Sequence, residues 1–322
     1  MTRAVPWDEI RTPDGDYNVR LIGGGGVVPL FWAKDAEGHC LFVIELEGDH
    51  TEQFRKNSTA VHGIRVDLRM LDATRGQGLV LTLEQHVDKD LFFGLCETLV
   101  QSLRETKDSA AAMAVALAHL KRWKAFLAGK KTRLLSAEEI RGLFGELQFL
   151  RMLYQERLDE KEAVEAWCGP DRIQQDFIFG NTAVETKALS GRERSSVRIS
   201  SEDQLEALCD NFYLTVFRLS DMPESDRALS LNEAVRRIES EISDAEALEE
   251  FGDRLGAYGY VEMREYDKPK FIVSAQQTYR VIDGFPRLIR SALPEGIARV
   301  NYDIELEKIA PFECEMEQIW GG

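Results

Sequence analysis

The stretch Gln175-Asp-Phe-Ile-Phe-Gly-Asn-Thr-Ala-Val-Glu-Thr-Lys187 decides the fold of the central part of the chain. Its Gly-Asn pair lies between two apolar-rich runs, a pattern typical of a two-residue β-hairpin loop. With that loop, Asp176 falls directly opposite Glu185, and Lys187 points to the same face as Glu185. The sequence therefore predicts two carboxylates and one ammonium group on one face of a strand pair.

These charged groups need a partner, because both faces of the hairpin carry apolar side chains. Phe177 and Val184 make one face apolar, and Ala183 and Leu189 add apolar side chains to the other. A strand that is apolar on both faces is central in a sheet, and paired acids on such a strand require a cation. Carboxylate oxygens suit Mg²⁺ or Mn²⁺ rather than zinc. The hairpin therefore predicts a metal site.

A third acid, Glu146, comes from a helix predicted just before the hairpin. Ser136 and Glu139 form a capping box at its start, and we expect the helix to run to about Leu158. Glu146 lies at the edge of the apolar stripe of this helix. A Glu between apolar neighbours is expected to have a partner. An ordinary helix acid is the alternative for Glu146 taken alone.

Composition and cysteine usage bound the class of protein. The chain has 322 residues, of which 44% are hydrophobic and 30% charged, as is usual for a globular protein. It shows no apolar run long enough to span a membrane and no secretory signal. Its five cysteines are scattered without a CxxC pair, which argues against a disulfide framework or a zinc site. We therefore expect a cytoplasmic protein.

The charge of the chain is unusual for a protein that binds nucleic acid. Its net charge is −16, whereas phosphate binding usually leaves a basic footprint. Two basic runs nevertheless flank the hairpin motif: residues 121–133, with six basic residues and no acid, and the group Arg192, Arg194 and Arg198. These runs favour a phosphate-rich partner. Each run taken alone is also typical of an ordinary solvated surface.

The expected fold class is α/β (α+β), with four regions. Residues 1–95 are expected to form a strand-rich, antiparallel N-terminal domain. Residues 96–135 are expected to form a helical connector, and residues 136–229 the core that holds the hairpin. Residues 230–322 are expected to form a helix and strands packed on this core.

Several single elements are also predicted. Within the core we expect a strand at 197–199, a helix at 201–209 and a buried strand at 212–217. A charged helix is expected from Leu231 to about Leu255, with short strands after it, the first near 260–263. The glycine run 23–26 lacks the GK[ST] ending of a phosphate loop and precedes a strand, which favours a hairpin tip.

The order of an acid on a helix, an Asp, and then Glu-x-Lys on the next strand resembles the PD-(D/E)XK nuclease superfamily. Glu185-Thr-Lys187 corresponds to its ExK element and Asp176 to the preceding Asp. The resemblance extends over residues 136–217 and is strongest to a branch found in bacterial restriction and phage-defence gene clusters. Its motifs are Gly142-Leu-Phe-Gly-Glu-Leu, Trp167-Cys-Gly-Pro170, Asp176-Phe, Ile199-Ser-Ser and Gln204-Leu. Asp171 forms a literal Pro-Asp pair but lies too far upstream to face Glu185.

This resemblance implies a restriction-endonuclease-like core and a Mg²⁺-dependent DNA endonuclease, with Mn²⁺ able to substitute. Asp176, Glu185 and the carbonyl of Thr186 would hold one or two ions, and Glu146 would complete the shell or bind the second ion. Lys187 would orient the attacking water and help to deprotonate it. Gln204, which matches a polar residue of many members, would contact phosphate or Lys187.

The resemblance also implies partners, and two rival functions stay open. The expected substrate is duplex DNA, and the expected partners are a second copy of the chain, a helicase-like ATPase or a methyltransferase. One rival is a catalytically silent DNA-binding or assembly subunit. The other is a glycosidase that uses Glu146 and Glu185, a class that does not require Lys187. Metal dependence separates these functions.

Overall fold

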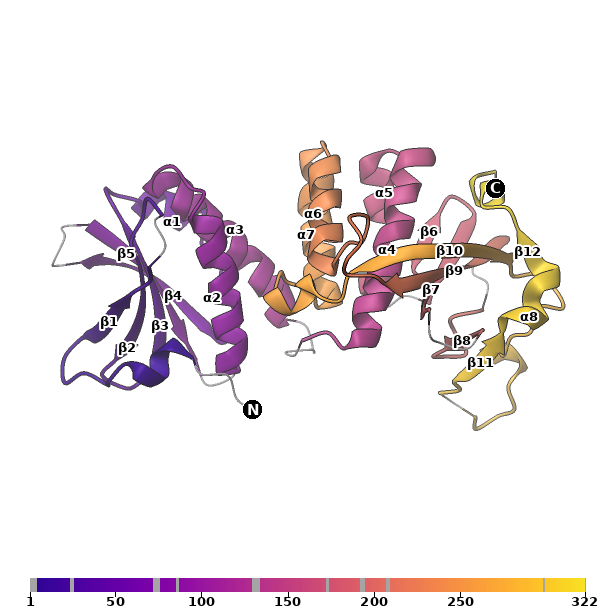
Figure 1. Cartoon of the computed structure of the whole chain (residues 1–322), viewed down its shortest axis with the longest axis horizontal. Helices are drawn as coiled ribbons and strands as arrows, with labels where there is room; N and C mark the ends of the chain where they lie inside the picture. The colour runs from indigo at the N-terminus through magenta and orange to yellow at the C-terminus, as the bar shows by residue number, and fades with distance from the viewer. Residues whose placement is uncertain are drawn as a thin grey trace. The chain divides into compact units, whose positions relative to one another are not determined.

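A computed structural model of the chain describes residues 5–23, 26–71, 76–84, 87–128, 134–171, 174–191, 195–206, 209–297 and 299–321. The chain divides into two compact units, each described here by itself (Figure 1). Unit 1 comprises Met1–Leu134 and Leu255–Arg264, and unit 2 comprises Leu135–Arg254 and Glu265–Gly322. The helices that we expected to form a connector between residues 96 and 135 therefore belong to unit 1.

Unit 1 is built on a five-stranded antiparallel sheet in the order β1-β2-β3-β5-β4. Its strands are β1 (Tyr17–Leu21), β2 (Leu30–Asp35), β3 (Cys40–Leu46), β4 (Ile64–Leu71) and β5 (Gly76–Leu83), and its helices are α1 (Thr51–Asn57), α2 (Lys89–Leu103) and α3 (Ser109–Ala128). The antiparallel strands predicted from period-two alternation are confirmed. The N-cap of α2 is Asp88, whose side chain accepts the N–H groups of Asp90 and Leu91.

Unit 2 holds a mixed five-stranded sheet in the order β12-β10-β9-β7-β6, in which β7 and β9 are parallel and the other pairs antiparallel. Its strands are β6 (Phe177–Phe179), β7 (Thr182–Ser190), β9 (Asn211–Asp221), β10 (Phe271–Arg280) and β12 (Glu313–Cys314). A separate two-stranded sheet pairs β8 (Ser196–Ile199) with β11 (Tyr302–Glu305). The buried strand predicted at 212–217 is therefore confirmed as the centre of β9.

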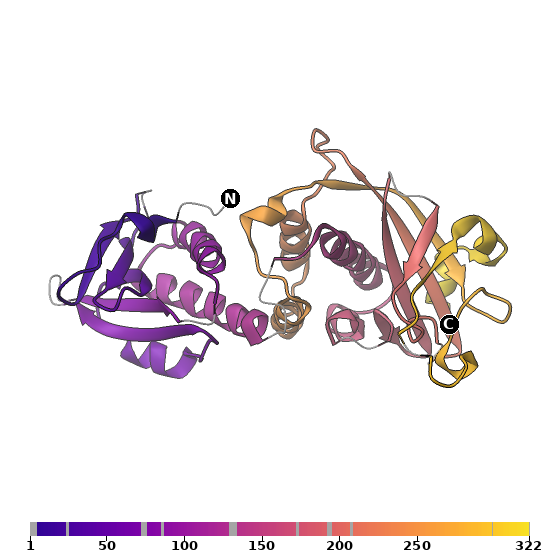
Figure 2. The same ribbon diagram turned by 90° about the horizontal axis from the view of Figure 1, so that it is seen from below.

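Helices and the C-terminal segment cover the two sides of this sheet. The helices of the unit are α4 (Ala137–Glu156), α5 (Glu160–Ala166), α6 (Leu231–Glu241), most of α7 (Ala245–Tyr258), α8 (Leu306–Ile309) and α9 (Glu317–Trp320). Figure 2 shows α4 on one side of the sheet and the yellow C-terminal segment on the other. A Cβ added at Gly145 of α4 would lie 3.1 Å from the Cβ of Ala188, so this glycine lets α4 approach β7 closely.

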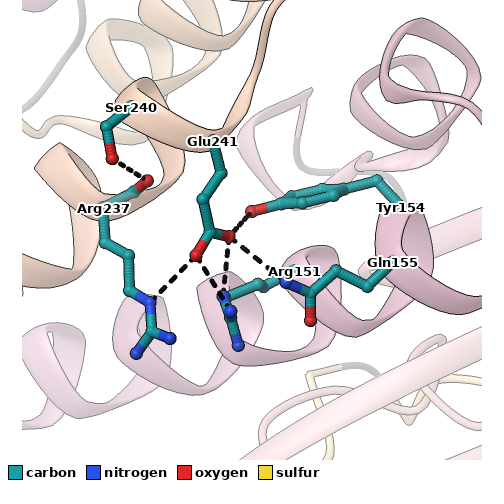
Figure 3. Close-up of polar contacts among 6 residues, drawn as sticks. All are labelled: Arg151, Tyr154, Gln155, Arg237, Ser240 and Glu241. Carbon is teal, nitrogen blue, oxygen red and sulfur yellow. Dashed lines mark hydrogen bonds and ion pairs between the residues drawn. The ribbon is translucent and has the colours of Figure 1, made fainter.

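The helix α4, which carries Glu146, begins as predicted. The Ser136 hydroxyl accepts the N–H of Glu139, and the Glu139 carboxylate accepts the N–H of Ser136. A cluster of polar side chains then fastens α4 to α6 (Figure 3). The Glu241 carboxylate accepts two hydrogen bonds from Arg151, at 2.8 and 2.9 Å, and one each from Tyr154 and Arg237, at 2.6 and 3.0 Å. This cluster holds the helix that supports the site.

Three predicted elements differ from the structure, namely the helix at 201–209, the single helix from Leu231 to about Leu255 and the strand near 260–263. Residues 202–205 form turns, and carbonyls of residues 203–206 accept from the side chains of Gln175 and Arg287. The predicted strand at 197–199 is confirmed as β8, which pairs with β11 in a separate sheet.

The helix expected from Leu231 to Leu255 is split into α6 and α7, and residues 260–263 form no strand. The break follows from the Glu160 carboxylate, which accepts the N–H groups of Ser243 and Asp244 between the two helices. None of the described helices has the length and apolar character needed to cross a membrane. No disulfide joins the cysteines in the described part of the chain.

Candidate metal centre

The hairpin that carries the predicted site has the expected register. Phe179 pairs with Thr182, Ile178 with Ala183, and Phe177 with Val184. The two-residue loop is made possible by the glycine at position 180, whose φ of +53° is in the left-handed region. The loop chemistry read from the sequence therefore sets the position of every side chain on β7.

Glu185 and Lys187 lie side by side on β7, as the alternation of a strand requires. Lys187 Nζ donates to Glu185 Oε1 at 2.6 Å, and the two side chains are 17% and 1% exposed. The other carboxylate oxygen, Glu185 Oε2, is buried and has no hydrogen-bond partner among the described residues. A buried carboxylate oxygen without a donor is costly, so this atom is a candidate ligand for a cation.

Asp176 directly precedes the ladder of β6 and β7, whose last pair is Phe177–Val184. Its backbone carbonyl accepts from Cys168 N and Gly169 N at 2.7 and 3.1 Å. Its carboxylate instead accepts from Thr186, from the backbone N–H at 2.8 Å and from the hydroxyl at 2.7 Å. The Asp176 carboxylate therefore contacts the residue between Glu185 and Lys187.

Glu146 approaches from the α4 side of the sheet. Its side chain is 6% exposed, and its Oε2 accepts from the indole Nε1 of Trp167 at 2.7 Å. Ala183 and Leu189 belong to a core cluster that contains no residue of α4. Because side chains alternate along a strand, Glu185 shares the face of Ala183 and Leu189. Glu146 comes from the helix side of β7, and its charge contributes to the raised pKa of Lys187.

Gln204 contacts Lys187, as one of its two predicted roles requires. Its Oε1 accepts from Lys187 Nζ at 3.3 Å and from the N–H of Ser200 at 2.7 Å. The turn that carries Gln204 is held from outside as well: Gln175 Nε2 donates to the carbonyl of Glu206 at 2.9 Å. Gln175 is fully buried and immediately precedes Asp176. Sequence analysis missed Gln175, and its position beside Asp176 was the available signal.

Burial and the neighbouring charges shift the pKa values of the three charged groups at the site. Burial raises the pKa of the Glu185 carboxyl to about 8, and the Asp176 carboxylate adds to this rise. Burial also raises the pKa of Asp176, although Lys187 and the hydrogen bonds from Thr186 oppose it. Burial lowers the pKa of Lys187, but the carboxylates of Glu185 and Asp176 outweigh it, so that the pKa is raised. The site is therefore short of positive charge.

The donor set fits a hard divalent cation in its chemistry. Glu146, Asp176 and Glu185 offer oxygen only, and Glu185 Oε2 is buried without a donor. They do not form a group whose ligand atoms all lie within 4.8 Å of one another; among the described residues only Asp35, Glu37 and His39 do so. A ligand role for the Thr186 carbonyl stays a prediction.

The basic runs are only partly described. Lys121, Arg122 and Lys124 are exposed on α3, and Arg198 is exposed on β8. The other members lie outside the described residues: Lys130, Lys131, Arg133, Arg192 and Arg194. Asp171 lies in a short 3-10 turn, Gly169–Asp171, before β6, and its side chain is outside the described part.

Comparison with known proteins agrees with the order of the motifs. A family described as "Putative PD-(D/E)XK family member, (DUF4420)" matches residues 4–307, nearly the whole chain. Neither the curated proteins nor the solved structures include a match. Membership implies a restriction-endonuclease-like core, in which α4 and the strands β6, β7 and β9 occupy the motif-bearing region. The chain belongs to this DUF4420 family, whose description is that of a putative PD-(D/E)XK family member.

Proposed function

We propose that the protein is a Mg²⁺-dependent endonuclease that hydrolyses phosphodiester bonds in DNA. The observation that carries this proposal is the buried carboxylate of Glu185, which binds Lys187 through one oxygen, while no described residue donates to the other. Family membership supports it, because the Glu-x-Lys pair of β7 stands in the order that this family's motif requires.

Three acids would hold the metal, namely Glu185, Asp176 and Glu146. A bound divalent cation would polarise the scissile phosphate and lower the pKa of a bound water. Glu185 Oε2 is the atom most ready for this, since no described residue satisfies it. Asp176 is kept in place by its two bonds from Thr186, and Glu146 by the bond from Trp167.

Lys187 would act on the water and on the phosphate. Its ammonium group is held by Glu185 Oε1 and Gln204 Oε1, which account for two of its three N–H donors. A third donor in this fixed setting is suited to orient a nucleophilic water or to bind an oxygen on which negative charge develops. Gln204 would keep Lys187 in this position rather than contact DNA.

The choice of DNA as substrate rests on the family and on the exposed basic residues of α3 and β8. Because the chain carries a net charge of −16, its own affinity for DNA is expected to be low and strongly dependent on salt. Association with a second copy, a helicase-like ATPase or a methyltransferase of a restriction or phage-defence system is part of the proposal and follows from the sequence resemblance alone.

A catalytically silent DNA-binding or assembly subunit is the second candidate. The observation that favours it is the separation of the carboxylates, whose ligand atoms do not all lie within 4.8 Å in the described structure. Such a subunit would bind DNA without cutting it and without taking up a divalent ion at Glu185.

The test is cleavage of supercoiled plasmid by the full chain in Mg²⁺, Mn²⁺ or EDTA, with Glu185→Gln as the site variant. Glu246→Gln is the matched control, because Glu246 forms an exposed ion pair with Lys161 in the same unit. We expect metal-dependent cleavage that falls about 100-fold or more in Glu185→Gln and is unchanged in Glu246→Gln. Cleavage in EDTA, or equal cleavage by both variants, would contradict the proposal. DNA binding without cleavage or Mn²⁺ uptake would favour the silent subunit.

A further inference from the structure

Residues 167–169 contact both Glu146 and Asp176, although they lie in neither α4 nor β6. We propose that this segment is a positioning clamp that sets how these two acids are presented to a divalent cation. Trp167 and Gly169 are its positioning residues, and the inference rests on the metal-dependent function proposed above. The motif Trp-Cys-Gly is part of the family resemblance, and the function proposed above uses only the indole of its tryptophan.

The first arm of the clamp is the indole of Trp167. Its Nε1 donates to Glu146 Oε2 at 2.7 Å, and the whole side chain is buried. Trp167 itself is held through its backbone, because its N–H donates to Val164 and its carbonyl accepts from Arg254 of α7. The indole therefore offers its N–H from a fixed position, and the Glu146 carboxylate is oriented by it.

The second arm is the absence of a side chain at Gly169. A Cβ at this position would lie 2.3 Å from Glu146 Oε2 and 3.2 Å from Trp167 Nε1. The first distance is far inside van der Waals contact, and the atom that would have to move is the end of the Glu146 side chain. An alanine here would thus displace the carboxylate rather than the fold.

The third arm is the backbone of Cys168 and Gly169. Their N–H groups both donate to the carbonyl of Asp176, at 2.7 and 3.1 Å. These bonds hold the backbone of the residue whose carboxylate reaches Thr186. One three-residue segment thus links the helix acid to the strand acid.

The chain contains a second Trp–Glu pair and a second glycine that provide control variants. Trp320 Nε1 donates to Glu156 Oε2 at 2.9 Å, so the same donor joins the same kind of acceptor on the same helix. That second pair is exposed. Trp320→Phe therefore matches Trp167→Phe in chemistry without touching the site. Gly321→Ala is the control for Gly169→Ala. It adds the same methyl group, but a Cβ at Gly321 has its nearest neighbouring atom at 3.8 Å and therefore displaces nothing.

The test measures binding of Mn²⁺ to the full chain by electron paramagnetic resonance, without DNA. We expect Trp167→Phe and Gly169→Ala to weaken Mn²⁺ binding about 10- to 100-fold, the usual effect of losing a group that orients a metal ligand. Trp320→Phe and Gly321→Ala should bind within about twofold of the wild type. In plasmid cleavage, the two site variants should need more Mn²⁺ for half-maximal rate but recover the maximal rate at saturating metal.

Each outcome decides the proposal. Wild-type affinity in both Trp167→Phe and Gly169→Ala, or equal losses in the two controls, overturns the clamp and leaves the proposed function standing. Wild-type protein that binds no Mn²⁺ overturns both. Should Trp167→Phe fail to fold by circular dichroism, Gly169→Ala decides alone, since the added methyl group meets a side-chain end rather than backbone.

Discussion

Two glutamates of unit 2 occupy opposite kinds of surroundings. Glu241 of α6 is 26% exposed and accepts hydrogen bonds from Arg151, Tyr154 and Arg237. Glu185 of β7 is 1% exposed; its Oε1 accepts from Lys187, and its Oε2 has no hydrogen-bond partner in the described part of the chain. The more exposed carboxylate is the better satisfied.

The pKa values of the two groups differ accordingly. Partial burial raises the pKa of the Glu241 carboxyl, but the hydrogen bonds from Arg151, Tyr154 and Arg237 outweigh it and bring the pKa to about 2. Burial and the neighbouring Asp176 raise the pKa of Glu185 to about 8. The Glu241 cluster is explained by what it does for the fold, since it joins α4 to α6. The Glu185 environment costs the fold stability, and a bound cation would offset that cost.

Removing the ammonium group from the site should have the largest effect. Lys187→Ala removes the ammonium group that lies beside Glu185 and Asp176. We expect metal-dependent plasmid cleavage to fall about 100-fold or more. Lys161→Ala is the control, because Lys161 forms an exposed ion pair with Glu246 and should change nothing. Cleavage by Lys187→Ala at the wild-type rate would contradict the proposed role of the Glu185–Lys187 pair in cleavage.

Neutralising the satisfied glutamate should affect stability and not function. Glu241→Gln keeps the shape of the side chain but loses the charge that Arg151 and Arg237 bind, and we expect the free energy of unfolding to fall by about 2 kcal/mol. Urea unfolding followed by circular dichroism measures this. Mn²⁺ affinity should stay that of the wild type. A large loss of affinity without loss of stability would contradict the structural role of this cluster.

The same glutamate should make stability depend on pH. Its folded pKa of about 2 lies below the ordinary value of 4.5, so its contribution is fully present above about pH 5 and is lost as pH falls toward 2. Between pH 6 and pH 3, the wild type should therefore lose about 1 kcal/mol more stability than Glu241→Gln. The measurement is urea unfolding of both proteins at pH 6, 4 and 3. Parallel curves would contradict the low pKa.

The sequence predicts those features of the site that depend on local rules. The Gly-Asn loop predicted the β6–β7 register, and the alternation of β7 then placed Lys187 beside Glu185. The capping box at Ser136 likewise predicted the start of α4. Each of these depends on residues within a few positions of one another, for which turn geometry and strand periodicity suffice.

The rest depends on contacts between distant segments. The backbone N–H groups of residues 168 and 169 donate to the carbonyl of Asp176, and no pattern near Asp176 predicts these contacts. The helix expected after β8 is replaced by turns whose carbonyls are bound by Gln175 and Arg287, from 28 or more residues away. The donors to Glu241 come from two helices that the sequence shows only as separate amphipathic stretches. They are Arg151, Tyr154 and Gln155 of α4 and Arg237 of α6.

The smallest effect is expected at a group of possible ligand atoms that lie close together but whose side chains are less buried than that of Glu185. Asp35, Glu37 and His39 lie at the turn between β2 and β3, with ligand atoms within 4.8 Å of one another. Both carboxylate oxygens of Asp35 are already engaged by His39, one with its backbone N–H at 2.7 Å and one with its ring Nδ1 at 2.8 Å.

The turn itself therefore explains this group, and Glu37, which is exposed, can be changed without cost to the fold. We expect Glu37→Gln to leave Mn²⁺ affinity and plasmid cleavage within about twofold of the wild type. Titration of Mn²⁺ by electron paramagnetic resonance, with Glu185→Gln measured beside it, tests this. If Glu37→Gln removed a bound ion and Glu185→Gln did not, closeness of ligand atoms would be the better guide to metal binding in this protein than a buried oxygen without a donor.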